Sequence, residues 1–338
     1  MSVKNIALVV DPFFLENKLF DIDDTFINWD NICYQHYCLK SLLYKYNVNL
    51  STYDFFSDYS SFKKVIFYNY HRIEVPTMDK QHYLFMWEPV VVQPELYDKN
   101  YHANFSKVFT FCDELVDNKK YFKINYSYLI PTTIQKNLSQ KKKLCTLIAG
   151  NKIVCHPLEL YSKRVEAIRW FEQNHPDEFD LYGRGWNIPS NRILRKIYNR
   201  SSLIKRYLLK ILPKLYPSYC GEIEEKIPVL QKYKFAICYE NARDISGYIT
   251  EKIFHCFFAG CVPIYLGADN ITKYVPANCF IDKRNFATYE VLYDYISKMA
   301  DEEYLKYLEN IETYLNSKQI RQFSVQHFAD SVVEEILN

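Results

Sequence analysis

Short apolar runs bounded by polar residues recur throughout the first 130 residues of the chain. Five of them have the length of a buried strand, at 5–10, 49–53, 64–68, 83–87 and 107–111. Helical spacing of apolar residues is clearest over 29–46, where Ile32, Leu39 and Leu43 fall on one face. Strands that alternate with helices predict a parallel sheet, so we expect residues 1–131 to form a first α/β domain.

The same alternation continues after a polar, basic stretch, 132–143, which we interpret as an interdomain linker. A chain of 338 residues exceeds one typical core, so we expect a second α/β domain over 144–318. Its expected elements include a strand at 144–149, a helix at 157–173, a strand and turn at 179–187, and helical segments after 286. The last helix, within 319–338, is expected to cover the second domain or to pack back on the first.

The densest pattern lies in residues 232–286. A strand at 235–239 is followed by a loop, by a helix that Thr250 opens, and by a second strand at 262–266. Ligands of a parallel sheet bind at the carboxyl ends of its strands. The loop and the start of the helix are therefore expected to carry a binding site.

Lys252 stands in the first turn of that helix, next to Glu251. A helix start carries positive partial charge and free N–H groups, which favour Glu and disfavour Lys. A lysine there is explained if an anion binds between it and the helix end. The alternative is a solvated lysine on an exposed turn.

Four motifs in this segment are specific in sequence and order. They are YEN at 239–241, GYITEK at 247–252, AGCVPIYLG at 259–267 and PANCFID at 276–282, with Asn285-Phe286 behind the last. Together they resemble the donor-binding segment of the α1,3/4-fucosyltransferase family, with weaker similarity back to about residue 144. The resemblance implies an α/β fold of the GT-B type, two Rossmann-like domains that face each other across a cleft. It also implies transfer of fucose from GDP-fucose to a hydroxyl group of a glycan acceptor.

The resemblance further implies which residues contact the donor. Arg164 corresponds to the family's arginine on the nucleotide diphosphate, because it precedes the expected helix core at Val165; Lys163, Arg169 and an ordinary surface arginine are the alternatives. Arg164 and Lys252 together would hold the β-phosphate. The other expected contacts with ribose, sugar or phosphate are Tyr239, Glu240, Asn241, Tyr248, Thr250, Glu251 and Arg184, the last of which either approaches the donor or is solvated on its loop.

A carboxylate at the end of the strand YLFMW is the expected general base. Glu88 follows this strand, and Pro89, the next residue, ends the strand's ladder of backbone hydrogen bonds. In the resembled family a glutamate in this place takes the proton of the acceptor hydroxyl. The surroundings here, WEPVVVQPE, differ from the family's Glu-Ser-Pro, so Glu95 is a competitor, and either carboxylate could be merely solvated on its loop.

The family inverts configuration at the anomeric carbon of the sugar, so one base and two cations suffice without a covalent intermediate. No D-x-D flanked by apolar strands lies near the donor motif, and no His/Cys/Glu cluster has metal-ligand spacing. We therefore expect no required metal or other cofactor, with room for weak stimulation by a divalent cation. Two alternatives stay open: the same fold with another GDP-activated sugar, and a catalytically idle, glycan-binding relative.

Residues 181–221 contain no Asp or Glu, and the part at 188–220 is interpreted as a basic insertion in the second domain. Lysines and arginines alternate with aliphatic residues over 191–214, which is typical of a peripheral contact with an anionic membrane surface. Such a contact would suit a lipid-linked glycan acceptor. The other interpretation is a helical hairpin packed on its own domain. No nucleic-acid partner is expected, because the net charge is only +2.

The composition fits a globular protein, with 49% hydrophobic and 24% charged residues. No apolar run is long enough to span a bilayer, and the N-terminus lacks a basic region followed by a hydrophobic core. The ten cysteines lack a CxxC pair and mostly lie in apolar runs, which is typical of buried free thiols. We expect a cytoplasmic protein, at most peripheral on the membrane, of the bacterial or viral type rather than the anchored animal type.

Overall fold

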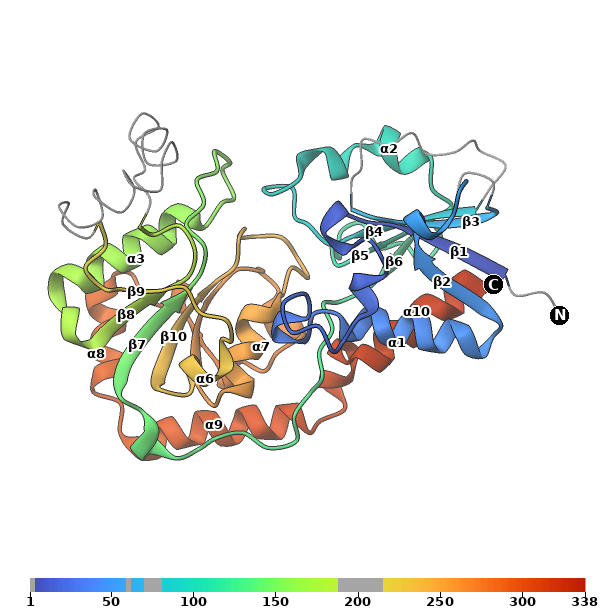
Figure 1. The fold of residues 1–338 in the computed structure, drawn as a ribbon. Helices are drawn as coiled ribbons and strands as arrows, with labels where there is room; N and C mark the ends of the chain where they lie inside the picture. The colour runs from blue at the N-terminus through green and yellow to red at the C-terminus, as the bar shows by residue number, and fades with distance from the viewer. Residues whose placement is uncertain (1–3, 59–61, 70–80, 188–214, 338) are drawn as a thin grey trace, which may run out of the picture.

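The computed structural model describes residues 4–58, 62–69, 81–187 and 215–337. Within these ranges, two six-stranded sheets form the centres of two domains that lie side by side (Figure 1). The strands of each sheet pair in parallel, with helices packed on the faces. The two-domain α/β architecture predicted from the sequence is therefore confirmed.

The first domain contains the sheet with strand order β2-β1-β3-β4-β5-β6. Its strands are β1 (Lys4–Val9), β2 (Val48–Thr52), β3 (Lys64–Tyr68), β4 (Gln81–Met86), β5 (Lys107–Thr110) and β6 (Tyr121–Lys123). Its helices are α1 (Tyr34–Lys45) and α2 (Lys99–Ala103), with short 3-10 helices η1 (Pro12–Phe14), η2 (Lys18–Phe20), η3 (Trp29–Asn31), η4 (Tyr53–Phe55) and η6 (Pro94–Tyr97). The single helix expected over 29–46 is divided, because Asp30 and Asn31 have φ of 51° and 66° and break the helical backbone.

The second domain contains the sheet with strand order β12-β11-β10-β7-β8-β9. Its strands are β7 (Lys143–Ile148), β8 (Phe179–Tyr182), β9 (Tyr219–Gly221), β10 (Tyr233–Tyr239), β11 (Val262–Leu266) and β12 (Ile281–Asp282). Its helices are α3 (Tyr161–Asn174), α6 (Ile227–Leu230), α7 (Glu251–Phe258), α8 (Tyr289–Ser297) and α9 (Asp301–Leu315). Its 3-10 helices are η7 (Leu138–Gln140), η8 (Pro176–Glu178), η9 (Ile271–Lys273), η10 (Ala277–Cys279), η11 (Lys283–Asn285) and η12 (Gln319–Phe323).

Two boundaries in this domain differ from the sequence prediction. Residues 157–160 precede α3 instead of belonging to it, because the Leu160 N–H bonds the carbonyl of Asn241 and Leu158 accepts from the Arg243 N–H. The insertion was expected over 188–220, but its last residues belong to β9, which extends the sheet beside β8.

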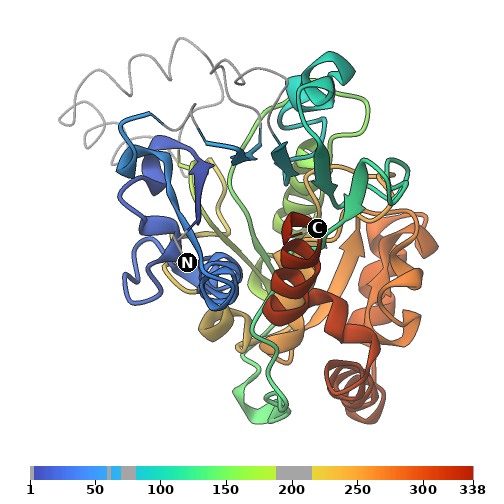
Figure 2. The same cartoon turned by 90° about the vertical axis from the view of Figure 1, so that its right-hand side faces the viewer.

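The last helix, α10 (Val325–Leu337), lies against α1 of the first domain, as Figures 1 and 2 both show. Phe328, Val332 and Ile336 of α10 are buried in the same apolar core as Leu39 and Leu43 of α1. Within the described ranges, the chain therefore passes from the first domain to the second through 132–143 and returns to the first before α10.

A further contact joins the two domains. The carboxylate of Asp113, beyond β5, accepts hydrogen bonds from the Tyr274 hydroxyl (2.5 Å) and the Asn270 amide (2.7 Å) of the second domain. Gly247 has a φ of +84°, and a Cβ added there would lie 2.3 Å from the carbonyl oxygen of Phe111. Glycine therefore lets the loop before α7 approach the first domain closely.

No helix in the described part of the chain is long and apolar enough to cross a membrane. All ten cysteines are free, and Cys155 and Cys220 are the two exposed ones. The basic stretch 191–214 lies outside the described residues, so its proposed contact with a membrane stays a prediction.

Candidate active site

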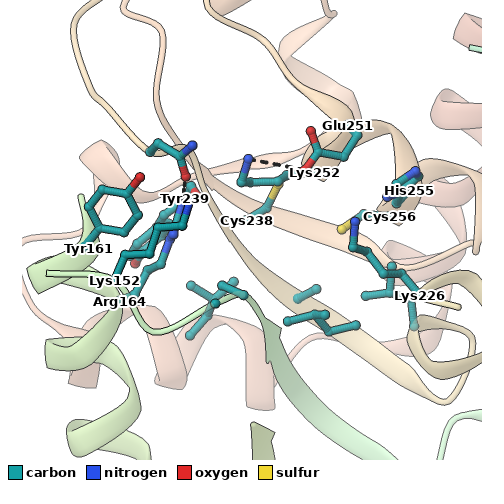
Figure 3. Close-up of a pocket in the computed structure, with 17 residues that line it drawn as sticks. Lys152, Tyr161, Arg164, Lys226, Cys238, Tyr239, Glu251, Lys252, His255 and Cys256 are labelled. Atoms are coloured by element: carbon teal, nitrogen blue, oxygen red, sulfur yellow. Dashed lines mark hydrogen bonds and ion pairs between the residues drawn. The ribbon is translucent and has the colours of Figure 1, made fainter. Parts of the chain in front are cut away.

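A cavity of about 230 Å³ lies at the carboxyl ends of β7 and β10 (Figure 3). The charged side chains that line it are Lys152, Arg164, Lys226, Glu251 and Lys252. Four cations against one carboxylate suit an anionic ligand such as a diphosphate. The position agrees with the general rule that parallel sheets bind ligands at this edge.

Arg164 on α3 is held rigidly at the end of β10. Its Nη2 donates to the carbonyl oxygens of Tyr239 and Glu240 (both 2.7 Å) and to Oδ1 of Asn241 (3.0 Å). Arg164 itself lies on the buried face of the helix, whereas Val165, which the sequence predicted to be buried, is half-buried. Three bonds to one nitrogen fix the orientation of the guanidinium group before any ligand arrives.

The two other cations considered on α3 have different surroundings. Lys163 is half-exposed and pairs with Glu166 (2.6 Å). Arg169 pairs with Glu172 (2.7 Å). Of the three candidates, Arg164 is the one that lines the cavity.

Lys252, in the first turn of α7, is oriented by a buried carboxylate. Glu240 is fully buried; its oxygens accept from the Thr250 N–H (2.8 Å), the Thr250 hydroxyl (2.6 Å) and Lys252 Nζ (3.1 Å). Thr250 occupies the predicted N-cap position, but its hydroxyl bonds Glu240 and does not cap the helix. The interpretation of Lys252 as a solvated surface lysine is wrong, because its side chain is 19% exposed.

Both charges in the first turn of α7 are stabilised in their ionised forms. Burial opposes the charge of Lys252, but Glu240 and Glu251 raise its pKa above the usual value. Burial likewise opposes the charge of Glu251, yet Lys252 and Lys226 hold its pKa far below the usual range. We infer that both side chains carry full charge at neutral pH.

Glu88 approaches this cluster from the first domain. It follows β4 and Trp87, is half-buried, and its backbone carbonyl accepts from the Tyr97 hydroxyl (3.3 Å). Burial raises the pKa of Glu88, and the nearby charges of Lys152 and Lys252 partly oppose this rise. Those two lysines belong to the second domain, so the carboxylate faces the cations across the domain boundary.

Glu95, the alternative to Glu88 as general base, lies exposed on η6. Arg184 is also directed to solvent: its side chain is 86% exposed and its Nε lies 3.5 Å from Glu222. Tyr248 is buried at the domain boundary, with its ring 5.0 Å from that of Phe111.

Three of the seven other expected contact residues line the cavity, namely Tyr239, Asn241 and Glu251. The remaining four, Glu240, Tyr248, Thr250 and Arg184, do not. Glu240 and Thr250 are buried, and they bond each other and Lys252.

Sequence reasoning missed Lys152, Lys226 and His255. Lys152 comes shortly after β7, so the strand-end rule that selected Glu88 could have found it. His255 lies three residues after Lys252, on the same face of α7, and burial lowers its pKa to about 4. Lys226 is held by Asp30 of the first domain (2.8 Å), a contact with no sequence signal.

Within the described ranges, no three His, Cys, Asp or Glu side chains are gathered so as to hold a metal ion.

Comparison with known families and sequences assigns the second domain. The family model described as glycosyltransferase family 10 (fucosyltransferase), C-terminal part, matches residues 138–331. An α-(1,4)-fucosyltransferase of Arabidopsis thaliana is 36% identical over 73 residues, 22% of this chain and 18% of that protein. The α-(1,3)-fucosyltransferase FucT of Helicobacter pylori is 34% identical over 74 residues, 22% of this chain and 15% of that protein. The chain thus matches under a fifth of the length of these two relatives.

Solved structures are similar over the whole chain. A crystal structure of α1,3-fucosyltransferase with GDP has a TM-score of 0.57 at 13% identity and covers 100% of this chain and 92% of its own. The Anabaena protein HepE in complex with UDP-glucose has a TM-score of 0.54 at 10% identity and covers 98% of this chain and 99% of its own. At these identities the likeness shows the fold, so the predicted GT-B arrangement is confirmed.

The family model includes Arg164, the cavity and all four motifs between 239 and 282. It spans more than half of the chain, and the resemblance seen in the sequence is therefore confirmed: the chain belongs to glycosyltransferase family 10, the fucosyltransferases.

Proposed function

We propose that this protein transfers fucose from GDP-fucose to a hydroxyl group of a glycan acceptor, with inversion at the anomeric carbon. The observation that carries the proposal is that Arg164 and Lys252 line the same cavity, while Glu88 of the other domain lies within the electrostatic reach of Lys252. The names of the relatives, which are α1,3- and α1,4-fucosyltransferases, support fucose as the sugar. A similar fold in complex with GDP-fucose supports the donor.

The chemistry follows from this arrangement. Glu88 accepts the proton of the acceptor hydroxyl while the hydroxyl oxygen attacks C1 of the fucose. The bond between C1 and the β-phosphate oxygen breaks, and its electron pair leaves with GDP. Arg164 and Lys252 stabilise the negative charge that grows on that phosphate.

A donor screen tests this proposal. GDP-fucose should raise the thermal midpoint by ligand linkage and release GDP when a glycan acceptor is present, whereas UDP-glucose should do neither. HepE, of similar fold, holds UDP-glucose, so the nucleotide must be tested and not assumed. Release of GDP from GDP-mannose but not from GDP-fucose would assign another GDP-sugar. Binding without release by any donor would assign the idle relative.

We further propose that the transfer needs no metal ion. Arg164 and Lys252 line the cavity and would supply the positive charge that a divalent ion would otherwise bring to the diphosphate. Turnover should therefore persist after dialysis against EDTA, and added Mg²⁺ or Mn²⁺ should change it no more than a few-fold. Loss of turnover in EDTA that Mn²⁺ restores would contradict this proposal.

A further inference from the structure

Three aromatic side chains are left exposed together on the segment between β1 and α1. Phe13, Phe26 and Trp29 are 40%, 72% and 41% exposed. The ring of Phe13 lies 6.2 Å from that of Phe26 and 6.0 Å from that of Trp29. Contiguous exposed apolar surface of this kind marks an interaction site more often than scattered single residues do.

The backbone that carries these rings is held by acidic and amide side chains. Asp11 accepts from the Phe13 N–H (3.0 Å), and Asp24 accepts from the Phe26 N–H (2.9 Å). Asn28, next to Trp29, accepts from the Cys33 N–H (3.0 Å). The backbone that carries the three rings is therefore held in place before a ligand binds, which lowers the entropy lost on binding.

The aromatic cluster lies at the same sheet edge as the proposed base. It follows the carboxyl end of β1, Glu88 follows the carboxyl end of β4, and the single strand β3 separates the two. Neighbouring strands are about 4.8 Å apart, so the ends of β1 and β4 lie roughly 10 Å from each other.

A residue next to the cluster contacts the wall of the donor cavity. Asp30, the residue after Trp29, pairs with Lys226 of the cavity wall (2.8 Å) and accepts from its backbone N–H (3.4 Å). Figure 1 shows this blue segment reaching from the first domain toward α6 and α7. Asp30 keeps a left-handed φ of 51°, an unfavourable backbone state for a residue with a side chain, while it makes this contact.

We propose that Phe13, Phe26 and Trp29 bind sugar rings of the glycan acceptor. This inference rests on the proposed function. A pyranose has an apolar C–H face, which a flat aromatic ring can remove from water, and a rim of hydroxyl groups, which carboxylates can accept from. The segment 11–32, which carries the three rings, contains six Asp or Glu and one Lys.

The same charges argue against other occupants. An anionic lipid surface would require Lys or Arg beside the aromatic rings, and here the excess is acidic. A second copy of the chain would bring an identical acidic patch against this one. A neutral, hydroxyl-rich ligand meets neither repulsion.

The test compares Phe26→Ala and the double change Phe26→Ala/Trp29→Ala with Tyr44→Ala. Tyr44 lies on α1 of the same domain and is 71% exposed, which matches the exposure of Phe26. Each protein is applied, with GDP present, to an array of mammalian and bacterial oligosaccharides. We expect the array signal of the double variant to fall at least tenfold and that of Phe26→Ala to fall by less. Tyr44→Ala should keep the wild-type signal.

Stabilisation by GDP and the slow hydrolysis of GDP-fucose in water should be equal in all these proteins, and they report on the donor function separately. If wild type and Tyr44→Ala hydrolyse GDP-fucose but the array signal is unchanged in the double variant, or absent in wild type, the proposed glycan site is wrong. If the array result is as expected but no GDP-sugar binds, the donor function is wrong instead. If the double variant still binds glycans but no longer binds phosphatidylglycerol vesicles, the cluster is assigned to a lipid. If it still binds glycans but no longer forms a dimer in gel filtration, the cluster is assigned to a second copy.

Discussion

Lys252 and Glu240 form an ion pair, with 3.1 Å between Nζ and Oε2, that joins the start of α7 to the end of β10. The carboxylate is fully buried and also bonds the backbone and hydroxyl of Thr250, whereas the lysine lines the cavity. Glu240 is thus a positioning residue that orients Lys252. Its buried charge is balanced from inside the protein and not by the donor.

Replacing Lys252 by Met should affect both turnover and stability. Loss of a group that stabilises the leaving diphosphate removes about 2–4 kcal/mol of transition-state stabilisation, or roughly 30- to 1,000-fold in kcat/KM. The substitution also leaves Glu240 buried without its cation, which destabilises a protein by about 3–5 kcal/mol. Steady-state kinetics and thermal unfolding measure the two effects separately.

The double change Glu240→Gln/Lys252→Met separates catalysis from folding. Gln keeps hydrogen-bonding groups for Thr250 and removes the buried charge, so this protein should unfold at a higher temperature than Lys252→Met. Its kcat/KM should stay as low. Recovery of turnover together with stability would show that Lys252 acts through the fold and not on the diphosphate.

Much of the fold was predictable because both sheets are parallel and buried on two faces. Their strands are short apolar runs that end at polar residues, so β1, β3, β10 and β11 were found within about two residues. β9 was missed because Tyr219–Gly221 is a three-residue edge strand without an apolar run. The break at Asp30 was missed because its left-handed backbone leaves no mark in the pattern of apolar residues, and its ion-pair partner Lys226 lies nearly 200 residues away.

The residues of the candidate site were predictable where the type of side chain indicates a single role, as a cation indicates phosphate binding. The sequence predicts Arg164 and Lys252 as phosphate-binding cations, and both line the cavity. Glu240 and Thr250 stand in the same motifs, but the sequence cannot distinguish a residue that contacts the ligand from one that orients its neighbour. That distinction depends on which way each side chain points from the end of β10.

Glu88→Gln should leave GDP-fucose binding nearly unchanged and reduce transfer by roughly a hundredfold or more. The amide keeps the size and hydrogen-bonding reach of the carboxylate but cannot take the proton. Glu95→Gln is the matched control, because Glu95 is exposed on η6 seven residues further along the same loop. Transfer rates and thermal shifts with GDP-fucose give the two readings. A larger loss from Glu95→Gln would assign the base to that residue, and equal mild losses would remove the base from this loop.

The charge of Lys152 should be visible in the pH dependence of transfer. Glu88 must be ionised to act, so activity is lost as pH falls through its pKa, which burial raises and Lys152 and Lys252 lower. Lys152→Gln removes one of the lowering charges, and the acidic limb of kcat/KM should move to higher pH. Lys298→Gln, on an exposed lysine beyond α8, should leave the limb in place. A limb that does not move in Lys152→Gln would mean that another group controls it.

His255 should make the stability of the protein fall in mildly acidic solution. Burial, with a contribution from Lys226, lowers its pKa from 6.5 to about 4 in the folded protein. The unfolded chain therefore binds the proton first as pH falls, so this stability is complete above pH 6.5 and is lost progressively toward pH 4. At about 1.36 kcal/mol per pKa unit, the loss is on the order of 3 kcal/mol.

His255→Gln cannot take up this proton, and its free energy of unfolding should fall less than that of wild type between these pH values. His327→Gln, at an exposed position of α10, should follow wild type. Urea unfolding of the three proteins across this pH range measures the difference, and parallel curves for His255→Gln and wild type would show that His255 is already protonated, or equally exposed, in the folded state.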